Sequence, residues 1–404
     1  MRPIKNLLLW IVITCAFAAC RKPYDPPETA TYYAYLVVEG VINSGADSTT
    51  ITLSRTVPLG GASTYRPETG AKVFVVSDQN AQYPLTESQP GTYVTAGLDL
   101  PPANKYSLHI ITASGKIYES DFVENQITPP IDTITHTFNS HSVQFYVSAH
   151  DPTNNTRYYR WEYHEYWSYH SPFYTVLQYQ NGAIVGLPVD SDYYHCYKNA
   201  TPPNGIFVAA SKLSQGTISQ EPITYVEGLS QKLTGEYAVE IKQYAITGDA
   251  YSYWQQLKTN TEELGTIFDA QPSSTLTNIH CVSMPSESVI GFVSVSTSTL
   301  KRAFLTEAEV PFRVFLNPGE TPPPEAWLGL DTLSCPLSHV LFVPDSTLSQ
   351  RLQQIFSPGQ YATPGFYYNP PTLIVGYNYT PVACVDCRKL GGSNQKPSWW
   401  PWPY

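Results

Sequence analysis

Cys20 is the residue whose surroundings point most directly to a covalent modification. The segment Phe17-Ala18-Ala19-Cys20 resembles a bacterial lipobox, in which the cysteine becomes the lipidated first residue, although Phe17 stands where leucine is usual. Arg2 and Lys5 precede an apolar run that is too short to span a bilayer and is typical of a cleaved signal. We therefore predict a signal peptide over 1–19 and lipidation of Cys20; ordinary cleavage within the same small-residue segment is the alternative.

The lipid would make a bilayer the first predicted partner. Acyl chains of the palmitate type bind membranes because each buried methylene adds about 0.8 kcal/mol of affinity. Residues 20–32 are polar and carry three prolines, which favours an extended spacer over a helix. This segment would hold the folded part away from the lipid surface.

Five further cysteines are candidates for disulfide bonds in an exported chain. They are Cys196, Cys281, Cys335, Cys384 and Cys387. Because five is odd, at least one stays unpaired, and the pairing cannot be read from the sequence. The last two form a Cys-x-x-Cys without the second pair of a zinc knuckle or the βαβ context of a redox motif. Structural disulfides are favoured over free thiols, and both over a metal or redox site.

The sequence carries none of the common catalytic signatures. A Gly-x-Ser-x-Gly elbow, a phosphate loop, a His-Glu-x-x-His and a dinucleotide fingerprint are all missing. His164 and His170 lie near Glu162 and Glu165, but their spacing suits neither one helical face nor one strand face throughout. We predict no catalytic residue, no metal site and no cofactor, and therefore a protein that is not an enzyme.

The composition limits the class of protein and partner. The chain has 23 Lys+Arg against 33 Asp+Glu, and an acidic chain without a basic run argues against nucleic acid as a partner. With 31 tyrosines and 35 prolines, it favours many short strands and turns over long helices. The fold class is therefore predicted to be mainly β.

Two β-rich regions are predicted on either side of Ile127-Thr128-Pro129-Pro130. The first, 33–126, is expected to be an immunoglobulin-like or transthyretin-like β-sandwich, with strands at 35–42, 50–54, 71–76, 91–94, 105–111 and 116–122. The second, 131–404, is expected to be a larger β-rich domain with one or two short helices. Its predicted strands lie at 142–147, 157–169, 235–243, 289–295 and 302–305, its convincing helix at 250–264, and its Pro/Gly-rich loops at 317–326 and 356–372.

An aromatic run within 157–179 is the candidate binding surface. Strand alternation places Tyr159, Trp161 and Tyr163 on one face, which we expect to lie in the core. The aromatic residues that follow outnumber what one strand face can bury, so some are expected to be exposed to sugars, peptides or another protein. These candidates are Tyr166, Trp167, Tyr169, Phe173 and Tyr174.

The end of the chain is also aromatic. Trp399, Trp400, Trp402 and Tyr404 alternate with prolines, which favours an extended strap. The strap could dock on the domain or meet a membrane or partner, and docking is favoured.

Several segments in a fixed order resemble the domain of unknown function 4249 family, lipoproteins of the Bacteroidota. They are Leu36 to Ile42, Tyr158 to Trp161, Ile267 to Pro272, Asn278-Ile279, Ser286 to Phe292, Lys301-Arg302, Cys384 to Arg388, Gly391-Gly392 and Pro397 to Trp399. This chain departs from the family by running five residues past Trp399 and by carrying Cys281, which leaves the disulfide pattern open.

The resemblance implies a location and a partner rather than a chemistry. The family has no established activity, and its members are neighbours of TonB-dependent outer-membrane transporters. It implies a lipid-anchored, surface-exposed outer-membrane protein that acts as a non-enzymatic accessory or substrate-capturing partner of such a transporter, handling a small ligand, peptide, glycan or chelate. The alternatives are an independent adhesin or envelope-structural lipoprotein and, least favoured, a hydrolase with an unrecognised site.

Overall fold

The computed structural model confirms that the protein is mainly β. It describes residues 34–57, 65–139, 142–188, 191–202, 206–211, 216–228, 230–262, 277–311, 335–342, 347–369 and 373–402. The predicted signal peptide, Cys20, the spacer, the 317–326 loop and Tyr404 lie outside these residues. Within the described ranges, no helix is long and apolar enough to cross a bilayer.

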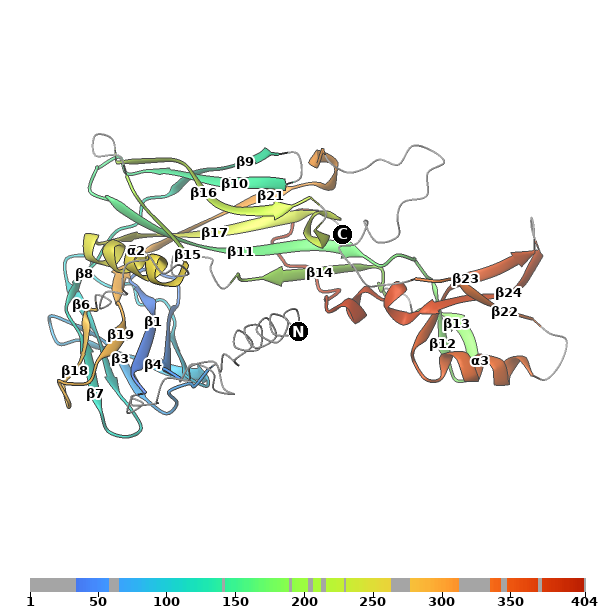
Figure 1. Ribbon diagram of the computed structural model, residues 1–404, viewed down its shortest axis with the longest axis horizontal. Helices are drawn as coiled ribbons and strands as arrows, with labels where there is room; N and C mark the ends of the chain where they lie inside the picture. The colour runs from blue at the N-terminus through green and yellow to red at the C-terminus, as the bar shows by residue number, and fades with distance from the viewer. Residues whose placement is uncertain are drawn as a thin grey trace, which may run out of the picture.

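One end of the molecule is built on a single sheet that folds over on itself (Figure 1). Its strands are β1 (Leu36–Asn43), β2 (Thr49–Arg55), β3 (Lys72–Ser77), β4 (Gln82–Gln89), β5 (Thr92–Thr95), β6 (Lys105–Ile111), β7 (Ile117–Ser120), β8 (Val123–Glu124), β18 (Ile279–Cys281), β19 (Val289–Gly291) and β20 (Ser294–Ser296). β4 pairs with β3 through its first half and with β5 through its second half, so it joins the two layers. Alternating apolar side chains from both layers, including Leu53, Val75 and Leu108, are fully buried between them.

The first structural unit includes residues that the sequence assigned to the second domain. β19 and β20 run parallel to β1, and β18 pairs with β7. The predicted boundary at 126 is therefore only the first of three crossings between the units, since the chain returns to the first unit at β18 and leaves it again after β20. Local periodicity cannot show this return, because parallel pairing joins segments that are far apart in the sequence.

The middle of the molecule is a barrel-like sandwich of two sheets. β16 (Thr217–Glu227), β10 (Ser142–His150) and β9 (Ile131–Phe138) form one sheet. The other contains β14 (His195–Ala200), β15 (Ile206–Ala210), β11 (Tyr158–His170), β17 (Tyr237–Ile246) and β21 (Ser298–Leu305). The core between them holds Phe145, Trp161 and Tyr237 among its buried residues. The short 3-10 helices η1 (Gln231–Leu233) and η2 (Glu307–Glu309) follow β16 and β21.

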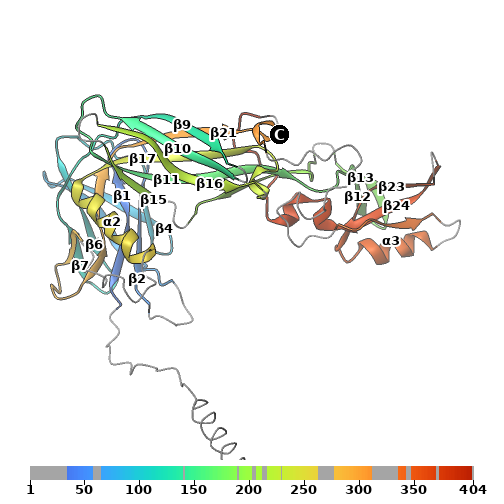
Figure 2. The same cartoon turned by 45° about the horizontal axis from the view of Figure 1, so that its top comes forward.

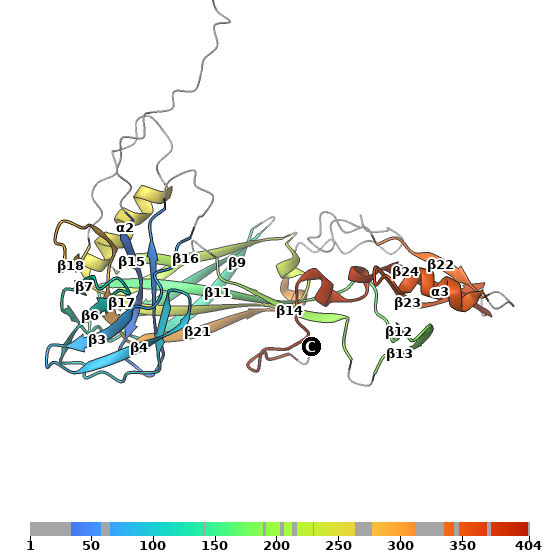
Figure 3. The same cartoon turned by 90° about the horizontal axis from the view of Figure 1, so that it is seen from below.

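The predicted helix is present as α2 (Gly248–Glu262) and covers the junction between the first unit and the barrel (Figure 3). Ala250 of α2 packs with Val41 of β1 and Ile246 of β17 in one cluster. Tyr253 contacts Phe292 at a ring-centroid distance of 5.5 Å. The helix therefore connects the two units through apolar contacts from both.

A third part, here called the distal lobe, projects from the barrel away from the first unit (Figures 1 and 2). It consists of residues 173–188, 335–342, 347–369 and 373–381, with β12 (Leu177–Gln180), β13 (Ala183–Gly186), β22 (Ser338–Leu341), α3 (Leu348–Phe356), β23 (Tyr361–Asn369) and β24 (Leu373–Pro381). The predicted loop over 356–372 is wrong, because β23 occupies most of it. Its Pro364 and Gly365 fall where the pairing with β24 shifts register, which is where a strand tolerates proline.

A buried carboxylate closes the turn between β10 and β11. Asp151 accepts hydrogen bonds from the backbone N–H groups of Thr153, Asn155 and Thr156 and from the Thr153 hydroxyl, at 2.7–3.1 Å. Burial raises the pKa of Asp151, but these hydrogen bonds outweigh it and lower the pKa to about 2. The turn is therefore stabilised by the ionised form.

This turn predicts an acid-dependent loss of stability. Because the pKa of Asp151 is lower in the folded chain, its contribution is present above pH ~4 and is lost as the pH falls towards 2. We expect Asp151→Ala to lower the free energy of unfolding by about 2 kcal/mol at pH 7 and by much less at pH 2. Urea unfolding at both pH values measures this; an equal loss at both would contradict the role of the charge.

Candidate functional site

The aromatic run lies on β11, the long strand that leads from the barrel to the distal lobe. Tyr159 and Trp161 are fully buried and Tyr163 is 8% exposed, so the predicted core face is confirmed. The Trp161 indole N–H donates to the Gln243 side chain at 2.8 Å. These residues hold β11 in the barrel core. The candidate binding surface therefore has to come from the aromatic residues that follow Tyr163 in the chain.

Three of the five predicted surface residues are covered. Trp167 is 7% exposed and Tyr169 is 2% exposed, and both belong to the barrel core. Tyr166, on the other face, meets the edge of Trp399 at 4.8 Å. The prediction is wrong for Trp167 and Tyr169, because this end of the sheet is covered on both faces.

The cover on the second face is the C-terminal strap, here Trp399, Trp400 and Trp402. It forms one cluster with Tyr166, Tyr197, Ala238 and Phe304. The Arg302 guanidinium also lies 4.2 Å from the centre of the Trp399 ring, which adds a cation–π contact. The prediction that the tail docks is therefore confirmed for these three tryptophans.

The remaining two candidates mark the place where the chain leaves the barrel. Phe173 is half-buried, and its backbone N–H donates to the Cys384 carbonyl at 2.9 Å. Tyr174 is 61% exposed and Val176 is 56% exposed, while Thr175 between them is buried and donates to the Thr363 carbonyl. We call Tyr174 and Val176 the neck surface.

Two disulfides hold the neck from both sides. Cys196 of β14 bonds to Cys387, and Cys335 bonds to Cys384. The Cys-x-x-Cys thus reaches two partners, one in the barrel and one in the distal lobe. Cys281 is buried in the first unit and unpaired, which confirms that one cysteine is left over. The sequence left the pairing open because it depends on how the barrel and distal lobe meet.

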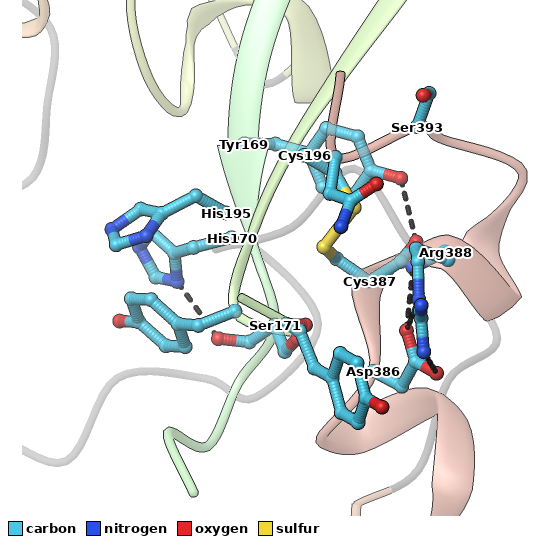
Figure 4. Close-up of a disulfide and its surroundings, with 12 residues drawn as sticks. Tyr169, His170, Ser171, His195, Cys196, Asp386, Cys387, Arg388 and Ser393 are labelled. Carbon is cyan, nitrogen blue, oxygen red and sulfur yellow. Dashed lines mark hydrogen bonds and ion pairs between the residues drawn. A yellow bond between two sulfur atoms is a disulfide. The ribbon is translucent and has the colours of Figure 1, made fainter. Parts of the chain in front are cut away.

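The surroundings of Cys387 are fixed by polar contacts (Figure 4). The Tyr169 hydroxyl donates to the Cys387 carbonyl, and the Cys387 N–H donates to the Tyr193 carbonyl. Asp386 accepts two hydrogen bonds from the Arg388 guanidinium, which lies 3.9 Å from the centre of the Tyr193 ring. The hydrogen bonds to Asp386 raise the pKa of Arg388, so this side chain stays charged. The short helices η3 (Val382–Cys384) and η4 (Cys387–Leu390) present these groups.

On the other side of the disulfide, two histidines are direct cross-strand partners (Figure 4). His170 stacks on Tyr194 at 4.7 Å, and Tyr174 meets the edge of Tyr194 at 5.5 Å. Burial raises the pKa of Asp192, but the backbone and imidazole groups of His195 outweigh it and lower the pKa. The exposed Tyr174 ring thus packs against Tyr194, which in turn stacks on His170.

The described residues around the neck present a contact surface. In the part of the chain that the structure describes, no three His, Cys, Asp or Glu side chains lie where they could hold a metal ion. An open hollow on α3 is lined by Gln350, Gln353, Gln354, Ser357 and Pro358, and none of these is an acid or base that titrates. What the neck offers is an exposed apolar pair on a backbone held by two covalent links.

Comparisons with solved structures give only weak likenesses. The chicken CNTN1 FN1–FN3 domains are 18% identical over 48% of this chain and 65% of that chain, with a TM-score of 0.15. Escherichia coli alpha-2-macroglobulin activated by porcine elastase is 9% identical over 54% of this chain and 19% of that chain, with a TM-score of 0.19. The Yersinia pseudotuberculosis adhesin InvE is 13% identical over 52% and 55%, with a TM-score of 0.15. The match spans less than two thirds of each of these chains.

No curated protein matches the chain. A family model does, over residues 21–302, which is more than half of the chain; it is described as a domain of unknown function (DUF4249). The matched range holds the first unit and the barrel strands up to the middle of β21, and it ends before the larger part of the distal lobe. The chain therefore belongs to the DUF4249 family.

Proposed function

We propose that the mature protein is a non-enzymatic accessory protein of the outer membrane, anchored by acyl chains on Cys20, that binds a TonB-dependent transporter through the neck surface. The observation that carries this proposal is the pairing of exposure and rigidity at the neck. Tyr174 and Val176 are exposed beside two disulfides, which join the Cys-x-x-Cys segment to the barrel and to the distal lobe. Rigid aromatic anchors of this kind bind partners at a low cost in conformational entropy.

The scarcity of charge in the distal lobe, where the neck surface begins, indicates the kind of contact. Arg351 is the only Asp, Glu, Lys or Arg in the described ranges of the distal lobe, whereas such residues make up 14% of the whole chain. A contact made here depends on apolar area and hydrogen bonds rather than on ion pairs. It should therefore survive moderate salt, because screening acts on charges.

Co-purification with matched variants tests the proposal. The tagged protein is extracted from its host's outer membrane in mild detergent, as wild type, as Tyr174→Ala with Val176→Ser, and as Tyr225→Ala. Tyr225 is 63% exposed on β16 and serves as the control, since its exposure matches that of Tyr174. We expect a stoichiometric transporter with the wild type and the control, and at least a tenfold lower yield with the neck variant.

Two results of this experiment would count against the proposal. Recovery of the wild-type protein alone, with its lipid in place, would favour an independent surface protein. Equal transporter yield from the neck variant would show that the transporter binds elsewhere. An unchanged far-ultraviolet circular dichroism spectrum shows that each variant is still folded.

A further inference from the structure

A second apolar surface lies at the far end of the distal lobe, away from the neck. It consists of five residues, here called the tip: Leu341, Phe342, Tyr368, Leu373 and Ile374. They meet through strand pairing, since Tyr368 faces Ile374 across β23 and β24 and the Phe342 N–H donates to the Val375 carbonyl of β24. Figure 1 places this end of β23 and β24 at the extremity of the long axis, opposite the first unit.

The tip is exposed on both sides of the sheet. Leu373 is 65% exposed and its neighbour Ile374 is 40% exposed, although successive strand residues point to opposite faces. Tyr368 is 49% exposed as well. If only one face of the sheet contacted a partner protein, the opposite face would stay in water and would be expected to carry polar residues. Apolar side chains on both faces suit an end that enters an apolar medium.

The residue types at the tip indicate which apolar medium it enters. Arg351 on α3 is the only Asp, Glu, Lys or Arg in the described ranges of the distal lobe, and His339 of β22 stacks on Tyr367 at 4.1 Å. Burying a charge in the interfacial layer of a bilayer is costly, whereas tyrosine and large aliphatic residues partition there. The tip has the residue types that such a layer accepts and lacks those that it rejects.

We propose that the tip inserts into the interfacial layer of a lipid bilayer and forms a second membrane contact besides the acyl anchor. The length of chain outside the described structure allows it: 13 residues separate Cys20 from Ala34, a reach of up to about 45 Å. The same membrane therefore lies within range of the folded part. An anchored protein also needs only weak affinity at a second site, because tethering keeps the local concentration high.

Two contacts at separate points would fix the orientation of the elongated protein. A protein held at one point can rotate about that point, whereas insertion of the tip lays the long axis along the membrane. The neck would then face a protein in that membrane at a constant height. This inference rests on the acyl anchor of the proposed function but holds whether or not a transporter binds the neck.

Vesicle binding by the chain from Arg21 onward, which lacks the acyl anchor, tests the proposal directly. The probe is a vesicle of phosphatidylcholine alone, and the readout is the bound fraction after sedimentation. We expect binding by the wild type that is unchanged in 1 M NaCl, and about tenfold or greater weakening in the Leu373→Ser, Ile374→Ser variant, because both changes remove methylenes that enter the lipid. Ile127→Ser is the control, since Ile127 is 57% exposed but lies outside the tip.

Three results would overturn the proposal. They are no binding of the wild type to neutral vesicles, equal binding by the tip variant, and binding only to anionic vesicles with loss at high salt. A melting temperature equal to that of the wild type shows that both variants are folded. Because the neck residues are intact in every variant, failure here leaves the transporter experiment unaffected.

Discussion

Replacing Cys196 and Cys387 together with alanine should lower the free energy of unfolding by about 5 kcal/mol. The two residues are 191 positions apart, so the bond removes much of the conformational freedom of the unfolded chain. The bond also joins β14 of the barrel to η4 beside the neck. Loss of this bond should therefore loosen the attachment of η4 to β14, beside the neck surface. Urea unfolding followed by circular dichroism measures the change.

The control for this prediction is Cys281→Ala. Cys281 is buried and unpaired, so its replacement removes a sulfur without removing a covalent link, and a loss of about 1 kcal/mol is expected. Reductant gives a second check, because it should break two disulfides in the wild type and only the Cys335–Cys384 bond in the double variant. A double variant within about 1 kcal/mol of wild type would show that the bond contributes little to the fold.

Replacing Lys232 with methionine should cost about 3 kcal/mol of stability. Glu165 on β11 is 1% exposed, accepts a hydrogen bond from the Tyr237 hydroxyl at 2.8 Å and pairs with Lys232 at 2.6 Å. Removing the lysine ammonium leaves a buried carboxylate without its counter-charge, and an isolated buried charge is strongly unfavourable. Burial and the neighbouring Glu165 raise the pKa of Tyr237 well above its usual value, so its hydroxyl remains a donor.

A double variant separates the charge from the packing. Glu165→Gln with Lys232→Met removes both charges, and we expect it to recover most of the loss because no charge is left buried and unpaired. Chemical denaturation of the two variants and the wild type gives the comparison. A double variant as unstable as Lys232→Met would assign the loss to packing against Trp167, whose ring the Lys232 ammonium lies over at 5.5 Å.

Strands with one buried face could be predicted from the sequence. β2, β6, β10 and β17 alternate apolar and polar residues, so their period of two is visible locally. β4 escaped prediction because its Pro84 and its polar residues resemble a turn. Pro84 is tolerated because only β3 pairs with that half of the strand.

The candidate site was harder to predict than the strands. Trp167 and Tyr169 belong to five candidates of which some were expected on the surface, because one strand face cannot bury so many rings. The structure also partly covers Tyr166, with tryptophans that lie more than 200 positions later in the chain. Tyr174 was identified correctly as exposed, but Val176 and the tip were missed. Their exposure is a property of the tertiary arrangement, and no local pattern distinguishes them from core strand residues.

Site-specific photocrosslinking from position 174 in the intact host membrane tests the central claim most directly. A photoreactive phenylalanine analogue replaces Tyr174 in one strain and Tyr225 in another, since the two side chains are 61% and 63% exposed. The account predicts that position 174 crosslinks to a TonB-dependent transporter, identified by mass spectrometry, and that position 225 does not. Crosslinks from position 174 to no protein, or to the same proteins as position 225, would contradict it.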